Sequence, residues 1–194
     1  MQFSKKEEYL RKKDYKLKEL IDTNGHIIFK ANKENQFNSL VDIIISQFIS
    51  TKAAYSISKK IKGNFSSKIL HEKHFKRLTI KDIKKLGLSE NKAKSIKELS
   101  NLFLETNSLN LEKLDYISIL NSIFGIGPWS INMFEIFCLG KFDIFSSKDA
   151  GLRLAMNNLN MVNKNSDFYK YDEYAKKWKP YRSIASIHLW KMVD

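Results

Sequence analysis

The chain has little of several things that would mark other protein classes. Cysteine occurs once among the 194 residues, at Cys138, so the sequence excludes an internal disulfide and a multi-cysteine metal site. This cysteine usage fits a reducing compartment. No apolar run approaches the roughly 18 residues that a membrane span needs, and the charged N-terminus lacks the apolar core of a signal peptide. We therefore expect no membrane partner.

Acidic residues are also in short supply. The chain has 21 Asp and Glu residues against 34 Lys and Arg residues, which gives a formal net charge of +13. A basic excess of this size predicts a polyanionic partner, with nucleic acid first, although a solvated lysine-rich surface is the alternative. The hydrophobic content of 43% is typical of a globular protein. Because no stretch alternates as a strand would, we predict an all-α fold.

Residues 120–149 form the most informative segment, LNSIFGIGPWSINMFEIFCLGKFDIFSSKD. Gly125 and Gly127 favour a tight turn, and Pro128 suits the first position of a helix. The backbone N–H groups at such a helix start favour an anion, and on a basic chain the expected anion is a DNA phosphate. The helix from Pro128 to Leu139 is apolar almost all round, so we expect it to be buried.

Two helices are predicted to meet at a corner near residue 48. Residues at helical spacing predict that the first helix ends near Gln47 and that the next begins near Thr51. Phe48 either projects from the corner or continues the apolar stripe into the core. Farther along, Lys148-Asp149-Ala150 starts another helix, with Asp149 as its N-cap or in its first turn. Three lysines, at positions 92, 94 and 97, are interpreted as a solvated helix face rather than a DNA contact.

The hairpin segment, with Ile123, Gly125, Gly127, Pro128 and Trp129 at its centre, resembles the hairpin of the helix-hairpin-helix DNA glycosylases. The closest resemblance is to the alkylated-base branch, the 3-methyladenine DNA glycosylase II enzymes. Three other stretches match family features in the same order. These stretches are Ser46–Ser50 with Ala53 and Ala54, Leu86–Ser89 with Lys92 and Ala93, and Trp178–Ser183 with Ala185, His188, Leu189 and Trp190.

The resemblance implies an all-α fold of two lobes with a central cleft. We expect a helical middle lobe at residues 37–110 and a second lobe, formed by residues 1–36 and 111–194, that carries the hairpin and the catalytic aspartate. Longer relatives have an extra N-terminal domain, so we expect this chain to be the catalytic core alone. The endonuclease III branch binds an iron–sulfur cluster with four cysteines, whereas this chain has one, and no cluster is expected.

Asp149 matches the catalytic aspartate of the family. Positive charge grows on the sugar as a glycosidic bond breaks, and a fixed carboxylate stabilises that charge or orients the attacking water. The alternative interpretation of Asp149 is a helix cap only. Ser147 stands where the family often has proline, and Asp143 is the second candidate carboxylate, which we interpret as a supporting or loop-capping residue.

Trp129 occupies the position at which bifunctional relatives carry a nucleophilic lysine, so the resemblance implies a monofunctional enzyme that uses water. The expected base pocket consists of Trp129, Met133 and Trp190, whose aromatic faces suit positively charged alkylated bases. Either tryptophan could instead be a core residue. Met133 departs from the aromatic residue that the branch often shows.

The resemblance also assigns contacts with DNA. Phe48 would fill the gap left by a flipped base, and Gln47 would bond to neighbouring bases or cap its own helix. The hairpin residues Gly125, Ile126 and Gly127 would bind phosphate, and their carbonyl groups could hold a monovalent cation in the DNA complex. His188 is interpreted as structural; Arg182 either ties the C-terminal helix or touches phosphate.

The sequence therefore predicts a DNA glycosylase that excises 3-methyladenine-type or 7-methylguanine-type bases from double-stranded DNA. We expect no redox cofactor and no catalytic metal, a monomer, and, in a prokaryote, a cytoplasmic location at the nucleoid. Two alternatives stay open. One is a helix-hairpin-helix DNA-binding module without catalysis, and the other is a glycosylase for oxidised or mismatched bases.

Overall fold

The computed structural model describes residues 3–106 and 110–193, and no β-strand occurs within these two ranges. The all-α prediction is therefore confirmed for the described residues. The chain divides into two compact units. We call the part from Asn32 to Leu139 the central unit, and the part before it together with the part from Gly140 onward the terminal unit.

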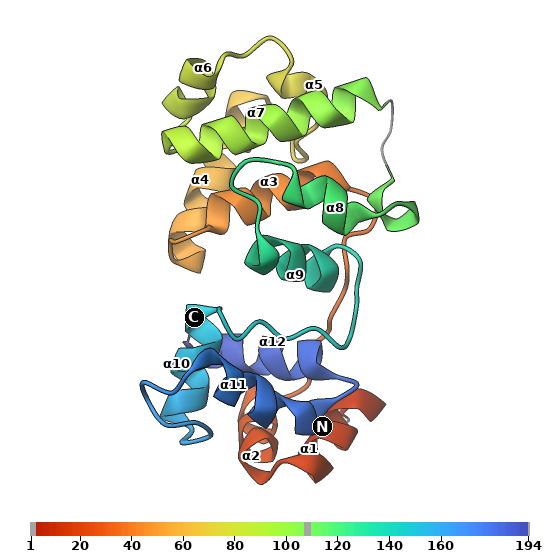
Figure 1. Ribbon diagram of the computed structural model, residues 1–194, viewed down its shortest axis with the longest axis vertical. Helices are drawn as coiled ribbons and strands as arrows, with labels where there is room; N and C mark the ends of the chain where they lie inside the picture. Colours follow the sequence, from red (N-terminus) through yellow and green to blue (C-terminus); the bar gives the residue numbers. More distant parts are fainter. Residues whose placement is uncertain (1–2, 107–109, 194) are drawn as a thin grey trace. The chain divides into compact units, whose positions relative to one another are not determined.

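The terminal unit is a small helical cluster made from both ends of the chain (Figure 1). In it, α12 packs against α10, α2 and α1. Its core contains buried side chains from all of these helices and the fully buried Trp178. Its elements are α1 (Lys5–Lys13), α2 (Tyr15–Asn24), α10 (Ala150–Asn158), α11 (Phe168–Ala175), the 3-10 turn η2 (Lys176–Trp178) and α12 (Arg182–Val193).

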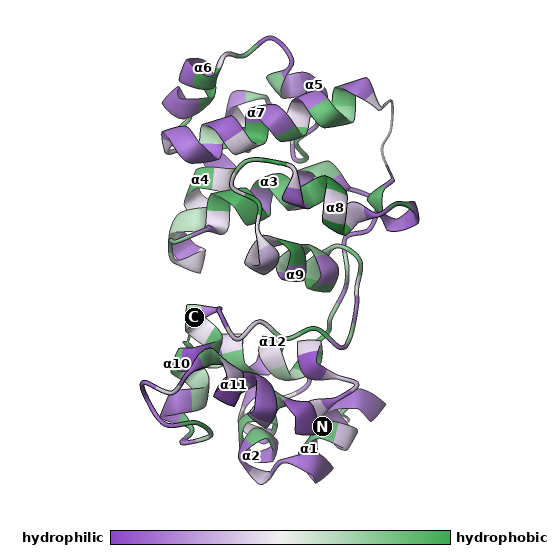
Figure 2. Ribbon diagram, viewed as in Figure 1, coloured by the Kyte–Doolittle hydropathy of each residue, from purple (hydrophilic) through white to green (hydrophobic). Residues whose placement is uncertain are grey.

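The central unit is built around α3, which packs against α4, α7 and α9. Hydrophilic and hydrophobic residues alternate along its longest helix, α7 (Figure 2), as expected for a helix with one face in a core. Its elements are α3 (Gln36–Ser46), α4 (Thr51–Asn64), α5 (Glu72–Phe75), α6 (Ile80–Lys85), α7 (Glu90–Glu105), η1 (Leu111–Lys113), α8 (Tyr116–Asn121) and α9 (Pro128–Phe137).

Local signals in the sequence set several helix starts. The side chains of Ser50 and Ser89 each accept a hydrogen bond from a backbone N–H in the first turn of the helix that follows, as good N-caps do. Pro128 is the first residue of α9, as predicted. Gly87 has φ 103° at the turn between α6 and α7, a conformation that favours glycine. The predicted helix corner is present, since α3 ends at Ser46 and α4 begins at Thr51.

The compact units differ from the predicted lobes of residues 37–110 and of 1–36 with 111–194. The helix-hairpin-helix belongs to the central unit rather than to the part of the chain that carries Asp149. The physical reason is that α9 is apolar almost all round and buries itself against α3. The two ends of the central unit lie next to each other, since the Asn32 N–H donates to the Phe137 carbonyl oxygen at 2.9 Å.

The lysines of α7 are not the simple solvated face that the sequence suggested. The ammonium group of Lys92 donates to the Ile45 carbonyl oxygen at 2.7 Å, near the C-terminus of α3, and burial lowers its pKa. Lys97 donates to the carbonyl oxygens of Phe75 and Lys76 at 3.1 and 3.0 Å. Only Lys94 of the three is exposed. Lys92 and Lys97 therefore cap the C-terminal ends of α3 and α5.

Throughout residues 3–106 and 110–193, every helix is too short or too polar to cross a bilayer.

Candidate functional site

The hairpin turn requires glycine at one of its two glycine positions. Gly125 has φ 77°, and a Cβ atom added there would lie 2.5 Å from the Ser95 Oγ of α7. Gly127 differs from the expectation, because its φ of −131° is extended backbone that any residue adopts. A Cβ atom on Gly127 would meet no atom of the described residues within 4 Å. The fold therefore explains Gly125, whereas none of these residues requires a glycine at position 127.

The predicted phosphate site lies at the start of α9. Gly127 is the N-cap and Pro128 the first helical residue, so the backbone N–H groups of this ten-residue helix begin at the turn. Ile126 is only 6% exposed, so its side chain belongs to the core. Any contact that Ile126 makes with a phosphate must come from its backbone. Such an arrangement favours an anion without a charged side chain.

Phe48 stands at the corner between α3 and α4 and is 103% exposed. This exposure excludes the alternative in which Phe48 continues the apolar stripe into the core. The backbone of Phe48 has φ 59°, a left-handed conformation that is costly for a bulky residue. An exposed phenylalanine on a strained turn gains little from folding, which makes it a candidate for a role in binding.

Gln47 is the C-cap residue of α3, but its side chain bonds to another segment of the central unit rather than to its own helix. Its side-chain amide Nε2 donates to the Gly125 carbonyl oxygen and to Ser130 Oγ, both at 2.9 Å. The central unit thus brings together the corner after α3 and the hairpin turn, which are the two predicted DNA-contacting segments. The sequence carried no signal for this pairing, because the two partners are 78 residues apart.

Asp149 is the N-cap of α10, as predicted. Its Oδ1 atom accepts a hydrogen bond from the Leu152 backbone N–H at 2.8 Å, and the residue is 8% exposed. The same oxygen accepts a second hydrogen bond from Trp190 Nε1, at 2.9 Å. The terminal unit therefore joins two of the predicted site residues, the carboxylate and one of the pocket tryptophans. The start of α10 is also a favourable place for negative charge.

The other two predicted pocket residues belong to the central unit. Trp129 lies half-buried in the first turn of α9, and Met133, one turn later, is 5% exposed. Met133 is therefore mainly a core residue of the central unit, as expected for an apolar side chain on a helix buried nearly all round. Trp129 is the more accessible of the two.

The structure assigns structural partners to Asp143 and Arg182. The guanidinium Nε of Arg182 donates to Asp143 Oδ1 at 2.6 Å, and its Nη2 donates to the Asp143 carbonyl oxygen at 2.8 Å. Arg182 thus ties the start of α12 to the loop before α10. Ser147, where the family often has proline, donates to Asp172 Oδ2 at 2.8 Å instead. These contacts give Asp143 a supporting role.

His188 is fully buried, in agreement with its structural interpretation, and its partner is a residue that the sequence reasoning missed. Glu7 is also fully buried, and its carboxylate lies 3.2 Å from His188 Nε2 and 2.7 Å from His26 Nδ1. Ser4 and Glu7 form a capping box at the start of α1, and the Ser-x-x-Glu spacing was the available signal.

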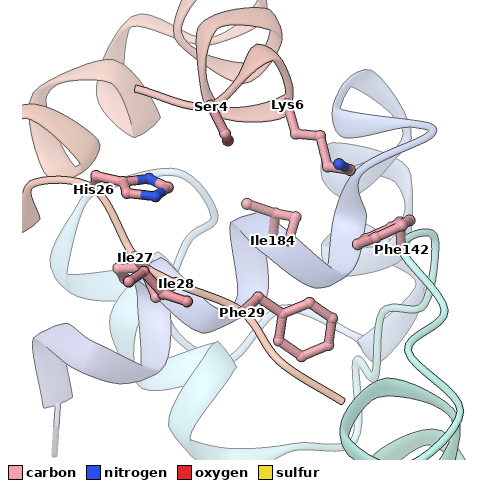
Figure 3. Close-up of a pocket in the computed structure, with 8 residues that line it drawn as sticks. All are labelled: Ser4, Lys6, His26, Ile27, Ile28, Phe29, Phe142 and Ile184. Carbon is pink, nitrogen blue, oxygen red and sulfur yellow. The ribbon is translucent and has the colours of Figure 1, made fainter. Parts of the chain in front are cut away.

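A pocket of about 220 Å³ lies in the terminal unit, between α1 and the segment that follows α2. Figure 3 shows the residues that line it. Its walls include Lys6, His26, Phe29 and Phe142. None of the predicted site residues lines it. Within the part of the chain that the structure describes, no three His, Cys, Asp or Glu side chains gather in a way that could hold a metal ion.

Comparison with known proteins places this geometry in a family. A family model described as "HhH-GPD superfamily base excision DNA repair protein" matches residues 41–180. The DNA-3-methyladenine glycosylase of Saccharomyces cerevisiae is 26% identical over 233 residues, and the match covers 96% of this chain and 78% of that protein. A relative from Bacillus subtilis is 25% identical over 170 residues, covering 81% of this chain and 59% of that protein.

A solved structure agrees with the fold. The 3-methyladenine DNA glycosylase Mag1 of Schizosaccharomyces pombe, determined in complex with abasic DNA, has a TM-score of 0.83 and 24% sequence identity, and the match covers 97% of this chain and 96% of that one. Since the matching family model spans well over half of the sequence, this chain belongs to the HhH-GPD superfamily of base excision DNA repair proteins.

Proposed function

We propose that the protein is a monofunctional DNA glycosylase that removes alkylated bases of the 3-methyladenine and 7-methylguanine type from duplex DNA and so starts base excision repair. One observation carries the proposal. A buried carboxylate, Asp149, accepts hydrogen bonds from the Leu152 backbone N–H and from Trp190 Nε1 at the start of α10, in a member of a base excision repair family. The name of the yeast relative supplies the alkylated-base class.

The chemistry asked of Asp149 is electrostatic. As the N-glycosidic bond breaks, the base leaves with the bonding electron pair and positive charge develops on the sugar. A carboxylate fixed beside the sugar stabilises that charge. Water then adds to C1′ and loses a proton, for which the carboxylate is a suitable acceptor. The products are a free base and an abasic site.

Trp129 supports the monofunctional assignment, because an indole offers no amine that could attack the sugar. In this proposal Trp129 and Trp190 each offer an aromatic face to a damaged base, whereas Met133, at 5% exposure, belongs to the core of the central unit. A positively charged base is both a good leaving group and a good partner for an aromatic face. The reaction is expected to need no redox cofactor and no catalytic metal.

DNA binding is assigned to the central unit. Phe48, fully exposed at the corner after α3, would enter the minor groove and fill the gap left by the flipped base. The turn from Gly125 to Gly127 would hold a phosphate. Because Gly127 has no side chain, a phosphate group could approach the backbone closely there. The net charge of +13 favours association with DNA at long range.

The hairpin carbonyl groups are also proposed to hold a monovalent cation when DNA is bound. Carbonyl oxygens are suitable ligands for a hard cation. The Gly125 carbonyl oxygen already accepts a hydrogen bond from Gln47, and its second lone pair would face the cation. Binding to abasic DNA should then weaken when potassium is replaced by choline at equal ionic strength. We also propose a monomer that works on chromosomal DNA and that, in a prokaryote, is cytoplasmic and associated with the nucleoid.

The test is release of bases from methylated duplex DNA, followed by alkaline cleavage at the resulting abasic sites. Wild-type protein should release 3-methyladenine or 7-methylguanine, and Asp149→Asn should lower the single-turnover rate by at least about 100-fold. Sodium borohydride should trap no covalent adduct with DNA. DNA binding without base release would indicate a binding module, and release of only oxidised or mismatched bases would indicate a different specificity.

A further inference from the structure

We infer that Trp190 is a positioning residue for Asp149, and that it acts through its indole N–H rather than only as a wall of the base pocket. The inference rests on the proposed function, because it assumes that Asp149 is the reacting carboxylate. It assigns to Trp190 a task that stacking alone does not require. A phenylalanine would stack as well on a base, but it could not donate a hydrogen bond.

Two donors from different elements meet at one oxygen. The Leu152 backbone N–H lies 2.8 Å from Asp149 Oδ1, and Trp190 Nε1 lies 2.9 Å from the same atom. The Leu152 contact is an ordinary N-cap bond made within three residues. The Trp190 contact comes from α12, which packs closely against α10. A second donor from another direction restricts the rotation of the carboxylate that an N-cap bond alone permits.

Gly151 provides the space for this contact. A Cβ atom at position 151 would lie 3.3 Å from Asp149 Oδ1 and 3.3 Å from Trp190 Cδ1, which is tighter than ordinary packing. Gly151 lies within α10, where glycine is a poor helix former. The absent side chain lets the indole ring reach the carboxylate. The glycine at position 151 is therefore part of the structure that allows the hydrogen bond between Trp190 and Asp149.

The indole group suits a permanent positioning role. Its N–H is only a donor and keeps its proton at physiological pH. The ring is carried by a helix whose first turn is fastened by the contacts of Arg182 and Ser183 with the loop before α10. A carboxylate that is already oriented needs little reorganisation when charge develops on the sugar. We therefore expect the Trp190 hydrogen bond to raise the rate of base release rather than the affinity for DNA.

The first experiment compares Trp190→Phe with wild-type protein. The variant keeps an aromatic ring and loses the N–H group. We expect the single-turnover rate of base release to fall about 10- to 100-fold, while the dissociation constant for abasic-site DNA stays within about twofold. Gly151→Ala, which crowds the same contact, should lower the rate in the same way. A normal rate in Trp190→Phe would overturn the inference.

The matched control is Trp178→Phe. Trp178 Nε1 also donates to a buried carboxylate, Asp14 Oδ2, at 2.9 Å in the same unit. This substitution removes an indole–carboxylate bond of the same length without touching Asp149. It should lower the melting temperature but leave the rate per folded molecule unchanged. An equal loss of rate in both variants would show that the effect of Trp190→Phe is a general loss of stability, and the inference would fail.

A double-mutant cycle separates positioning from stacking. If Trp190 acts through Asp149, then Trp190→Phe should cause no further loss of rate in an Asp149→Asn background. Equal losses in both backgrounds, or a changed preference between two damaged bases, would assign Trp190 to the pocket wall alone. Hydrogen exchange of the Trp190 indole N–H, followed by NMR, reports the bond directly. Its protection should fall in Asp149→Ala, and unchanged protection would overturn the inference.

These measurements also separate the inference from the proposed function. Absence of base release by wild-type protein would refute the proposed function, whereas the NMR measurement would still test the bond. Full activity of Asp149→Asn would refute the catalytic assignment. Reduced activity of Asp149→Asn together with an additive effect of Trp190→Phe would refute only the positioning role.

Discussion

The side-chain amide of Gln47 donates a hydrogen bond to the carbonyl oxygen of Gly125 at 2.9 Å. This bond connects two segments. One is the corner between α3 and α4, where Phe48 is exposed, and the other is the hairpin turn that precedes α9. The same amide reaches Ser130 Oγ in the first turn of α9. The two segments that we assign to DNA binding therefore form one connected surface in the central unit.

Replacing Gln47 by alanine should weaken DNA binding through the loss of this connection. We expect the dissociation constant for abasic-site DNA to rise about fivefold and the free energy of unfolding to fall by about 1–2 kcal/mol, as for two lost hydrogen bonds. Fluorescence anisotropy and urea denaturation measure the two effects. Gln36→Ala is the control, because Gln36 also makes two hydrogen bonds, to Leu111 and Asn110, away from the hairpin. Equal effects of both variants on DNA affinity would contradict the role of Gln47.

Replacing Phe48 by glycine should stabilise the protein while it weakens binding. Glycine adopts a positive φ without steric cost, so we expect a gain of up to about 1 kcal/mol in the free energy of unfolding. Loss of the ring should raise the dissociation constant for abasic-site DNA about 10-fold. Ser66→Gly, at φ 49°, is the control that should share the gain in stability but leave binding unchanged. Unchanged affinity in the Phe48 variant would remove the wedge from the proposal.

The lysines of α4 should contribute to the salt dependence of DNA binding. The helix, which follows the Phe48 corner, contains no acidic residue, and Lys52 and Lys59 are exposed. Exchange of both for glutamine should reduce the slope of log K against log salt by about 1–2 units. Lys92→Met should leave the slope unchanged, because the Lys92 ammonium group faces the Ile45 carbonyl oxygen. The reverse pattern would place the DNA on α7 instead.

Glu7 should make stability depend on pH. Burial alone would raise its pKa, but hydrogen bonds from the Ile27 and Ser4 N–H groups, from Ser4 Oγ and from His26 outweigh burial and lower the pKa from 4.5 to about 2. The stabilisation is therefore complete above pH 4.5 and is lost as the pH falls toward 2. Burial lowers the pKa of His188, so its contribution to stability is complete above the ordinary value of 6.5 and is lost as the pH falls through the lowered pKa of the folded state.

Glu7→Gln should lower the free energy of unfolding at pH 7 by about 2–3 kcal/mol, and it should flatten the change in stability between pH 4.5 and 2. Urea denaturation at several pH values measures both effects. Glu8→Gln is the control, because Glu8 sits next in the chain but pairs with Arg11 at the surface. A variant of Glu7 whose acid sensitivity equals that of wild type would contradict the assignment.

Much of the helical framework could be predicted from the sequence. Ser50, Ser89, Pro128 and Asp149 mark helix starts, because an N-cap or a first-turn proline acts on backbone groups within about four residues. The hairpin glycine at position 125 could also be predicted, since a tight turn needs a positive φ there. The glycosylase resemblance rests on such local motifs, and the family match confirms it.

The sequence by itself therefore determined the helices, the hairpin and the family. Only the tertiary structure decided which side chains act together. It brought Gln47 to Gly125 across 78 residues and Trp190 to Asp149 across 41 residues. It also placed the hairpin in the central unit with α3. These pairings depend on how buried helix faces pack against one another, and the periodicity of a single helix shows that it has an apolar face but not which partner covers that face.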